Sequence, residues 1–373
     1  MNVLLVGNYE PDGQESMLRF FECLRRELPR HGVTVDSIKP AVWFGRRRIG
    51  RGVDKWLAYL DKYVLFPSVL RRCIRRAHPD TIIHIADHSN SVYLRDELEG
   101  RQIVTCHDLL AVRGALGEAT DCPASRSGRM LQAAILRGLR RAGLVVCDST
   151  ATQNDFQRLT GGTRRSQVVW MGLNDAFRNL APGEARARLA PLGDAVLGRP
   201  FLVHVGSSLR RKNRELALRV IARLKPQWPG LLVFAGEGLS TSQTALMHTL
   251  GVSDRVIELR RPSHETLEAL YNTAHALLYP SRFEGFGWPV VEAQACGCPV
   301  VCSNTTSLPE VAGHAALMRG PDDEEGFVVD VLSLCNPAAR DALIRLGHEN
   351  VKRFTTGRMV ADYIAAYRSL GTA

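Results

Sequence analysis

The stretch from residue 274 to residue 302 constrains the fold most strongly. It predicts a buried strand, a loop with two glycines, a short helix and a second buried strand, over residues 274–279, 281–288, 289–296 and 299–302. Pro289 suits the start of a helix, where its missing N–H would have no partner, and Gly297 suits the end. Such a strand–loop–helix–strand unit is the building block of a parallel α/β sheet.

The glycine loop of this unit has the chemistry of an anion site. Gly285, Phe286 and Gly287 lie where a strand ends and a helix begins, so free N–H groups and the helix dipole favour a phosphate there. Glu284 and Glu292 flank the loop, and a carboxylate accepts hydrogen bonds from two hydroxyls, as a sugar diol requires. The pattern therefore favours a nucleotide sugar, with sugar and ribose on either side of a diphosphate. The alternative is two surface acids, one of which stabilises the start of a helix.

Similar units recur along the whole chain and predict two α/β sheets. The expected strands of the first series are residues 3–6, 33–38, 81–85, 103–106, 144–147 and 168–172, and those of the second are 201–205, 231–235, 256–259, 276–279 and 300–302. We place the boundary near Gly172, which gives domains of residues 1–172 and 173–356. A chain of 373 residues is long enough for two such cores.

Composition narrows the class of protein further. Hydrophobic residues make up 45% of the chain and charged residues 23%, without a run of about 18 apolar residues, so we expect no membrane span. The first residues predict a strand and not a signal peptide, which predicts a cytoplasmic protein. The nine cysteines match neither a disulfide nor a zinc framework. Four of them lie in apolar runs, where a thiol usually acts as a small hydrophobic side chain: Cys106, Cys147, Cys302 and Cys335.

The net charge of +10 is unevenly distributed, with basic clusters in the first half. Arg46, Arg47, Arg48 and Arg51 precede a stripe of aromatic and apolar residues at helical spacing, from Trp56 to Phe66. One interpretation is a helix that packs on the domain core beside solvated arginines. The other is an amphipathic surface that binds an anionic membrane. Nucleic acid is not an expected partner, because no recognised nucleic-acid motif accompanies the charge.

Three segments together closely resemble the retaining glycosyltransferases of family 4: residues 284–292, 295–301 and 307–313, which read Glu-Gly-Phe-Gly-Trp-Pro-Val-Val-Glu, Ala-Cys-Gly-Cys-Pro-Val-Val and Ser-Leu-Pro-Glu-Val-Ala-Gly. The resemblance implies the GT-B fold, in which two Rossmann-like domains face a central cleft. It also implies that Glu284 contacts the donor sugar and Glu292 the ribose. The backbone of Gly285, Phe286 and Gly287 would bind sugar hydroxyls and phosphate.

The resemblance assigns further residues. After the strand at 201–205, Gly206 is followed by Arg211 and Lys212, which match the cations that bind the donor diphosphate in that family. Whether Arg210 also binds the diphosphate is left open. Gly13 resembles the glycine loop near the diphosphate, although Gln14 replaces the usual second glycine. His107 matches a histidine that faces donor and acceptor in that family. The alternative is a polar residue at a strand end whose hydrogen bonds are all made within the protein. Residues 357–373 would form the helix that crosses back to the first domain.

The sequence thus predicts a glycosyltransferase that moves a hexose from a nucleoside diphosphate sugar to a glycan or lipid-linked acceptor in surface polysaccharide assembly. No D-x-D motif is present, so the protein's own cations would stabilise the leaving group, and we expect no metal and no cofactor. Two alternatives remain open. One is another GT-B enzyme, such as a nucleotide-sugar epimerase or a phosphorylase, and the other is a non-catalytic nucleotide-sugar-binding subunit.

Overall fold

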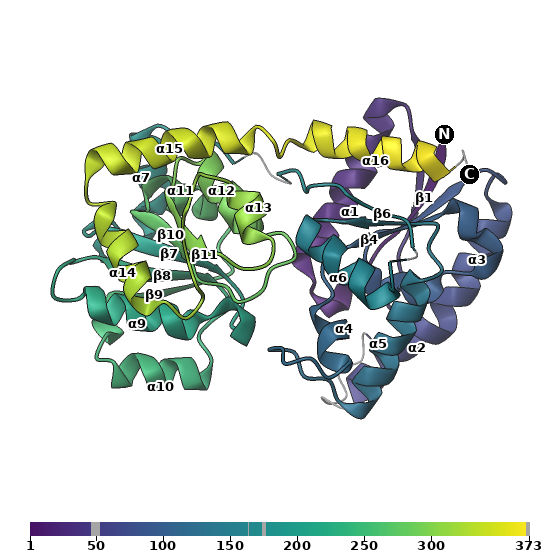
Figure 1. The fold of residues 1–373 in the computed structure, drawn as a ribbon, viewed down its shortest axis with the longest axis horizontal. Helices are drawn as coiled ribbons and strands as arrows, with labels where there is room; N and C mark the ends of the chain where they lie inside the picture. The colour runs from purple at the N-terminus through teal and green to yellow at the C-terminus, as the bar shows by residue number, and fades with distance from the viewer. Residues whose placement is uncertain (46–52, 163, 174–176, 371–373) are drawn as a thin grey trace. The chain divides into compact units, whose positions relative to one another are not determined.

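The computed structural model describes residues 1–45, 53–162, 164–173 and 177–370. The chain forms two compact units, each built on a six-stranded parallel sheet (Figure 1). The first domain comprises Met1–Trp170 and the C-terminal helix α16 (Thr356–Leu370), and the second comprises Met171–Thr355. The predicted α/β architecture of two Rossmann-like domains is confirmed.

The first sheet has the strand order β2-β1-β3-β4-β5-β6. Its strands are β1 (Asn2–Val6), β2 (Thr34–Ile38), β3 (Ile82–Ile85), β4 (Gln102–Cys106), β5 (Leu144–Cys147) and β6 (Ser166–Val168). The helices between them are α1 (Glu15–Glu27), α2 (Val53–Leu60), α3 (Phe66–Arg76), α4 (Leu110–Ala115), α5 (Arg126–Leu139) and α6 (Thr150–Thr160), with shorter turns η1 (Glu10–Asp12), η2 (Leu28–His31), the π-helical η3 (Asp61–Leu65), η4 (His88–Tyr93) and η5 (Asp96–Arg101).

The second sheet has the order β12-β11-β10-β7-β8-β9. Its strands are β7 (Phe201–Gly206), β8 (Leu231–Gly236), β9 (Val256–Arg260), β10 (Ala276–Tyr279), β11 (Val300–Ser303) and β12 (Leu317–Arg319). Its helices are α7 (Pro182–Leu189), α8 (Asp194–Leu197), α9 (Arg214–Leu224), α10 (Thr241–Thr249), α11 (His264–Thr273), α12 (Trp288–Ala295), α13 (Leu308–Ala312), α14 (Glu324–Ser333) and α15 (Pro337–Val351), with turns η6 (Ala190–Leu192), η7 (Arg210–Lys212) and η8 (Ser253–Arg255).

Both sheets reverse their strand order next to their first strand, and this reversal positions the candidate sites. In the second sheet β7 pairs with β8 on one side and with β10 on the other, and in the first sheet β1 lies between β2 and β3. Loops that leave neighbouring strands at such a point diverge to opposite faces of the sheet. The crevice between them, at the carboxyl ends of the strands, is where open α/β sheets bind ligands.

Helix α16 is anchored in the first domain by buried polar contacts. Both ring nitrogens of His84, on β3, are hydrogen-bonded, Nδ1 to the Tyr367 hydroxyl at 2.8 Å and Nε2 to Thr105 Oγ1 at 2.9 Å. The Tyr363 hydroxyl lies 2.9 Å from the same Thr105 oxygen. Burial lowers the pKa of His84 to about 3, so the ring is neutral and joins the last helix to the sheet as a structural group.

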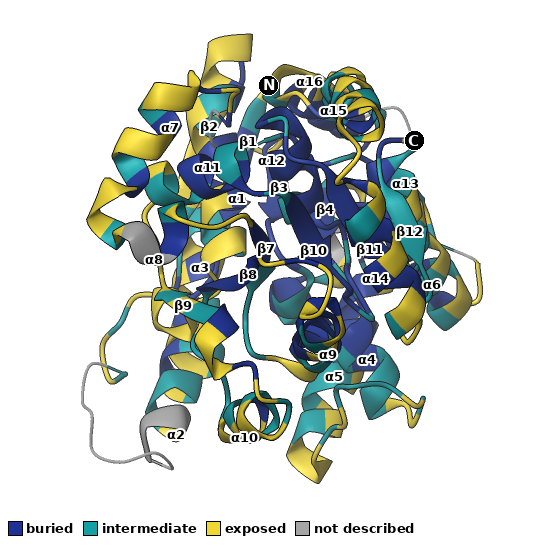
Figure 2. Ribbon diagram, turned by 90° about the vertical axis from the view of Figure 1, so that its left-hand side faces the viewer, coloured by how far each residue is buried: buried dark blue, intermediate teal, exposed yellow. Residues whose placement is uncertain are grey.

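The central strands of both sheets are buried (Figure 2), and the predicted strands mostly match them. Three details differ. The last strand of the first sheet is Ser166–Val168 and not residues 168–172, β12 was not predicted, and Cys335 is exposed and not part of an apolar core. Periodicity does not indicate a three-residue edge strand, because so short a strand buries too few side chains to leave a pattern. In the described part of the chain, no helix has the length and apolar character that crossing a membrane requires.

Candidate active site

Two loops meet at the reversal point of the second sheet and carry the predicted donor-site residues. The first follows β7 and contains η7, which ends at Lys212. The second follows β10, contains Glu284 and Gly285, and ends at Gly287, the N-cap of α12. Because β7 and β10 are paired, the two loops start side by side. The structure therefore brings together residues that are about 70 positions apart in the sequence.

Arg211, Lys212 and Glu284 form what we call the cation–glutamate cluster. Lys212 Nζ lies 2.7 Å from Glu284 Oε1, and Arg211 Nη1 lies 3.1 Å from Oε2 of the same carboxylate. The Tyr279 hydroxyl donates a third bond to Oε1 at 2.7 Å. Lys212 is only 8% exposed and Glu284 only 6%, so these contacts are largely removed from water. The cluster carries two positive charges against one negative charge.

The electrostatics of the cluster follow from burial and pairing. Burial alone would raise the pKa of Glu284, but the charges of Lys212 and Arg211 lower it to about 2. Burial lowers the pKa of Lys212, against the opposing effect of the Glu284 charge. Glu284 is therefore ionised at neutral pH and held by three donors, which makes it a hydrogen-bond acceptor and a weak base.

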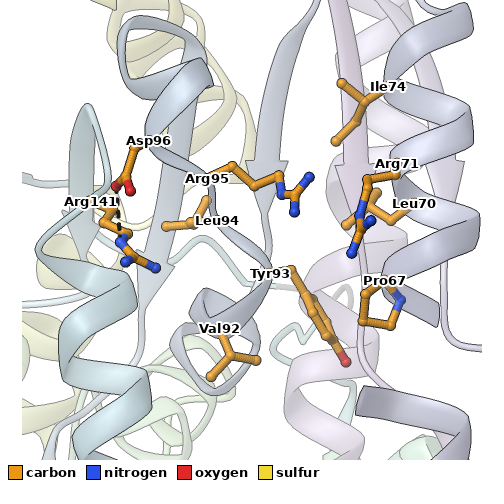
Figure 3. A pocket seen from close by; sticks show the side chains of 10 residues that line it. All are labelled: Pro67, Leu70, Arg71, Ile74, Val92, Tyr93, Leu94, Arg95, Asp96 and Arg141. Atoms are coloured by element: carbon orange, nitrogen blue, oxygen red, sulfur yellow. Dashed lines mark ion pairs between the residues drawn. The ribbon is translucent and has the colours of Figure 1, made fainter. Parts of the chain in front are cut away.

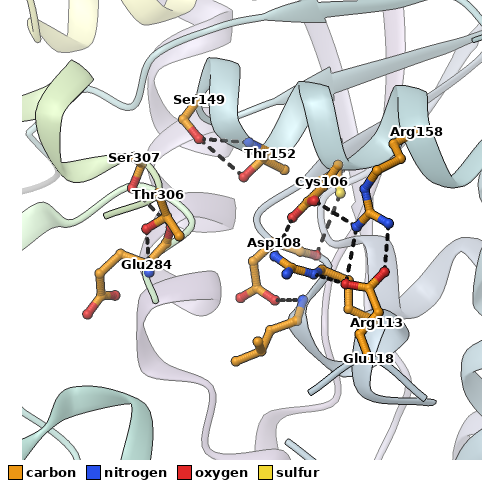
Figure 4. Close-up of polar contacts among 12 residues, drawn as sticks. Cys106, Asp108, Arg113, Glu118, Ser149, Thr152, Arg158, Glu284, Thr306 and Ser307 are labelled. Atoms are coloured by element: carbon orange, nitrogen blue, oxygen red, sulfur yellow. Dashed lines mark hydrogen bonds and ion pairs between the residues drawn. The ribbon is translucent and has the colours of Figure 1, made fainter. Parts of the chain in front are cut away.

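The glycine loop is fixed from behind by residues that the sequence analysis did not single out. Thr306 Oγ1 accepts the Glu284 backbone N–H at 3.1 Å (Figure 4). The Ser307 hydroxyl lies 3.0 Å from the Glu284 carbonyl oxygen and 2.8 Å from the Phe286 carbonyl oxygen, so these two acceptors share its hydrogen. The Phe286 ring is buried and packs edge-on against Phe354 at 5.6 Å. These contacts leave the backbone of the loop, and not the Phe286 side chain, to meet a ligand.

Two glycine positions in this region are required by geometry. A Cβ on Gly236 would lie 2.3 Å from the Gly206 carbonyl oxygen, so the ends of β7 and β8 approach more closely than any side chain allows. The N-cap Gly287 has φ +103°, and a Cβ there would lie 2.7 Å from Leu308. Substitution at Gly287 would strain the backbone and displace α13 from the start of α12.

Arg214 also supports this edge of the sheet, and sequence reasoning missed it. Its side chain is fully buried, and its guanidinium donates to the carbonyls of Gly206, Glu237 and Gly238 at 2.6–3.1 Å. It thereby joins the ends of β7 and β8. The signal was present in the sequence, because an arginine that opens an apolar helix directly after Asn213 interrupts the expected pattern.

Glu292 occupies a different environment from Glu284. It lies in the second turn of α12, which begins at Trp288, and not in the first turn as the sequence suggested. The side chain is buried, and Oε2 accepts a hydrogen bond from the Tyr271 hydroxyl of α11 at 2.9 Å.

The first domain places His107 at the carboxyl end of β4. Its Nδ1 lies 2.7 Å from Asp148 Oδ2, and its Nε2 lies 2.9 Å from the Ala86 carbonyl oxygen. Both nitrogens thus face acceptors, which requires both to carry hydrogen. Burial lowers the pKa of His107, but the charge and hydrogen bond of Asp148 outweigh this effect and raise the pKa to about 9. His107 is an imidazolium without a free nitrogen in this arrangement.

A second set of polar contacts adjoins this histidine. Asn8 Nδ2 lies 2.5 Å from Asp87 Oδ2 and 2.5 Å from Gln14 Oε1, and Asn90 donates to Asn8 Oδ1 at 3.0 Å. Gly13, with φ +65°, ends η1 directly before Gln14. We call Asn8, Asp87, His107 and Asp148 the histidine network. The predicted residues Gly13 and His107 therefore belong to one polar edge within their own domain.

No cluster of three or more His, Cys, Asp or Glu side chains suited to a metal ion occurs in residues 1–45, 53–162, 164–173 and 177–370. The predicted basic cluster of Arg46, Arg47, Arg48 and Arg51 lies outside the described residues.

Comparison with known proteins supports the same family along both domains. Residues 19–177 match the family described as Glycosyltransferase Family 4, and residues 194–336 match Glycosyl transferases group 1. Over 107 residues, 28% of each chain, the protein is 42% identical to the O-antigen chain mannosyltransferase B of Escherichia coli. Over 284 residues, 73% of this chain and 63% of the relative, it is 30% identical to the D-inositol 3-phosphate glycosyltransferase of Mycolicibacterium smegmatis. The chain thus spans less than two thirds of the length of these relatives.

Solved structures share the fold over nearly the whole chain. Sucrose-phosphate synthase from Thermosynechococcus elongatus superposes with a TM-score of 0.78 at 20% identity, over 99% of both chains. The Anabaena protein HepE, solved in complex with UDP and glucose, superposes with a TM-score of 0.73 at 17% identity, over 99% of this chain and 100% of that chain. With two Rossmann-like domains and a family match in each, the chain belongs to the family 4 (group 1) glycosyltransferases of GT-B fold.

Proposed function

We propose that the protein is a retaining glycosyltransferase that moves a hexose from a nucleoside diphosphate sugar to a glycan or lipid-linked acceptor. The observation that carries this proposal is the cation–glutamate cluster beside the glycine loop. Two cations converge there on one carboxylate, and the glycine loop leads into the N-terminus of α12. The excess positive charge suits a diphosphate.

The cluster can stabilise the leaving group without help from a cofactor. As the bond between sugar and diphosphate breaks, negative charge develops on the diphosphate. Arg211 offers a planar fork and Lys212 a point charge to that group. Both side chains are already held in place by Glu284, so little reorganisation is needed when charge develops. We therefore propose that the transfer is independent of added metal.

Glu284 and Glu292 have separate roles in this proposal. Glu284 accepts hydrogen bonds from hydroxyls of the donor sugar, and Glu292 from the ribose. The pKa of Glu284, lowered to about 2, argues against its use as a covalent nucleophile, since the carboxylate is held by three donors. Displacement on the same face of the sugar, assisted by the departing phosphate, explains retention better than a double displacement.

His107 acts in this scheme as a charged donor. Both ring nitrogens face acceptors, so the ring cannot take a proton from an acceptor hydroxyl until one contact opens. If the Ala86 contact opens, Nε2–H is free to donate to a ligand while Asp148 continues to hold Nδ1. This supports a role for His107 in orienting a sugar hydroxyl. The departing phosphate, and not His107, would then receive the acceptor proton.

The acceptor is proposed to be carried at an anionic membrane surface, in surface polysaccharide assembly. Trp43 and Trp56 are each 70% exposed, and Leu60 and Val64 follow Trp56 at intervals of four residues on the same helical face. Tyr59, Tyr63 and Phe66 are more buried, so the stripe predicted from the sequence divides between core and surface. Exposed tryptophans beside basic residues are typical of proteins that bind at a lipid interface.

A direct test begins with the donor. Thermal shift of the purified protein against GDP-mannose, UDP-glucose and related nucleotide sugars should identify one that raises the melting temperature. Incubation of that donor with candidate acceptors, in excess chelator, should then release nucleoside diphosphate and give a product with the donor's anomeric configuration by NMR. A protein that binds the donor and transfers nothing to any acceptor would be the binding subunit. Loss of transfer in chelator, restored by manganese, would contradict the leaving-group account.

A further inference from the structure

A pocket of about 300 Å³ opens in the first domain between α3 and the segment of residues 92–96 (Figure 3). Leu70, Tyr93 and Leu94 are buried and form its apolar floor. Its volume lies at the lower end of the range for small-molecule sites, which is about 300–1,000 Å³. We call it the arginine pocket, because Arg71, Arg95 and Arg141 lie around it.

The arginine pocket does not belong to the candidate active site. Asp96 begins η5, which leads directly into the first residue of β4, and Arg141 lies in the turn that leads into β5. These connections enter the amino ends of the strands. Ligands of open α/β sheets bind at the carboxyl ends, where His107 and Asp87 lie.

The charges around the pocket are unbalanced. Arg141 Nε pairs with Asp96 Oδ1 at 2.9 Å, so this arginine has a counter-ion. Among the side chains that the structure describes, which do not include those of Glu97 and Glu99, no carboxylate forms an ion pair with Arg71 or Arg95. Figure 3 shows these two guanidinium groups reaching from opposite walls, α3 and the segment that follows Leu94, into the same space. Two like charges that converge above an apolar floor repel each other unless an anion lies between them.

The walls of the pocket are held rigidly. The Gln102 side chain contacts the Arg95 backbone twice, since its Oε1 accepts the N–H at 2.9 Å and its Nε2 donates to the carbonyl at 2.6 Å. The Tyr93 hydroxyl donates to the Lys62 carbonyl at 3.1 Å, and the Tyr93 ring packs edge-on against Phe66 at 5.0 Å. The two arginines are therefore presented by backbone that is already ordered, as a binding site requires.

We propose that the arginine pocket binds an organic phosphate. Its phosphate would lie between Arg71 and Arg95, whose planar forks match phosphate oxygens. A short apolar portion of the ligand would lie on Leu70 and Leu94. The phosphate ester could come from a lipid headgroup or from a soluble metabolite. In either case the site is separate from the donor site of the second domain and is occupied independently of it.

The pocket itself is tested with hexyl phosphate by isothermal titration of the full chain at low salt. R71A/R95A should lower the affinity at least tenfold. R72A/R75A, which removes two exposed arginines of the same helix that do not line the pocket, should change it less than twofold. R71K/R95K keeps the charge and loses the forks, so its affinity should fall between these two. Inorganic phosphate should bind more weakly than hexyl phosphate to the unaltered protein. Equal affinities of R71A/R95A and R72A/R75A, with both variants folded by melting temperature, would overturn the proposal.

Once the pocket binds hexyl phosphate in this manner, vesicles identify the source of the ligand. If it is a lipid headgroup, R71A/R95A should bind vesicles that contain phosphatidic acid less tightly than R72A/R75A does. If it is a soluble phosphate ester, the two variants should bind those vesicles equally and differ only towards hexyl phosphate. Because no donor or acceptor is present in these measurements, their result is independent of whether the proposed transfer reaction is correct.

Discussion

The carboxyl edges of the two sheets hold polar clusters of opposite charge. In the second domain, Arg211 and Lys212 outnumber the single carboxylate of Glu284. In the first domain, the His107 imidazolium lies near two carboxylates. It pairs with Asp148, and its charge helps to lower the pKa of Asp87. Lys212, Glu284 and the residues of the histidine network are buried, and both clusters lie at the carboxyl ends of strands. In the proposed function this difference suits different ligands: an anionic diphosphate in the second domain, and neutral hydroxyls in the first.

The clusters also differ in how many of their charged and hydrogen-bonding groups already have partners within the protein. The side-chain nitrogens of Asn8 and His107 all have partners within the first domain, whereas Asp148 Oδ1 is buried without a hydrogen-bond partner among the described residues. In the cation–glutamate cluster, two cations share a single carboxylate, so a diphosphate can join Glu284 as a second anionic partner of Arg211 and Lys212. A network whose side-chain donors are already paired holds its shape, whereas a cluster with excess positive charge gains stability from an anionic ligand. We therefore expect substitutions in the second domain to act on turnover and binding, and those in the first to act on stability and its pH dependence.

The largest effect should come from Lys212→Ala. This change removes a cation that is proposed to contact the departing diphosphate, on which negative charge develops. Loss of one such contact typically lowers kcat by about 10²–10³-fold. Lys225→Ala, which removes an exposed lysine of the same domain, is the matched control and should leave kcat unchanged. Steady-state kinetics and thermal melting of both variants test the comparison. A Lys212→Ala protein that melts early and retains its specific activity would show that the lysine is structural.

Glu292→Ala should have a smaller effect, on binding. The lost hydrogen bond from a ribose hydroxyl to a carboxylate costs roughly 1.5–3 kcal/mol, which weakens donor and free nucleoside diphosphate alike by about 10- to 150-fold. Calorimetry with the free nucleoside diphosphate measures it. Tyr271→Phe removes the hydroxyl that contacts Glu292 without removing the carboxylate, and it should bind the nucleotide nearly as well as the unaltered protein. An unchanged dissociation constant for Glu292→Ala would exclude the ribose as its partner.

The contrast between the clusters also explains what the sequence could predict. Glu284 and the glycine loop were identified because they lie next to a strand end, and strand ends are visible as the limits of apolar runs. Lys212 was identified because it matches a lysine of the family that the chain resembles. Tyr279, Thr306 and Ser307 were not assigned a role, because their contacts depend on pairing between strands. The β7–β10 pairing brings Lys212 to Tyr279, and the β10–β11 pairing brings Thr306 and Ser307 to the glycine loop. The engagement of both His107 nitrogens likewise depends on Ala86 and Asp148, from two other strands. Pairing across a sheet leaves no trace in local spacing.

The histidine network should show itself in the pH dependence of stability. Because the folded-state pKa of His107 is raised to about 9 from an ordinary value near 6.5, its contribution is fully present below about pH 6.5 and is lost as the pH rises through 9. Each pKa unit of difference corresponds to about 1.4 kcal/mol. Melting curves of the unaltered protein and of His107→Gln, from pH 6 to pH 10, should therefore converge at the alkaline end. A constant difference across this range would mean that folding does not raise the pKa of His107.

The smallest effect concerns the surface of the first domain. Trp43 and Trp56 are far more exposed than aromatic residues of the second domain, where the large exposed apolar side chains are the aliphatic Leu209, Val329 and Leu346. If the first domain binds an anionic membrane, Trp43→Ser with Trp56→Ser should weaken binding to vesicles with anionic lipid by roughly tenfold, a loss of about 1.4 kcal/mol. Val329→Ser with Leu346→Ser is the control, since it removes two exposed apolar side chains from the other domain. Co-sedimentation at low and high salt measures both, and binding should fall as salt screens the lipid charge. Equal binding by the two double variants would show that the tryptophans do not contact lipid, and a soluble acceptor would then be the better explanation.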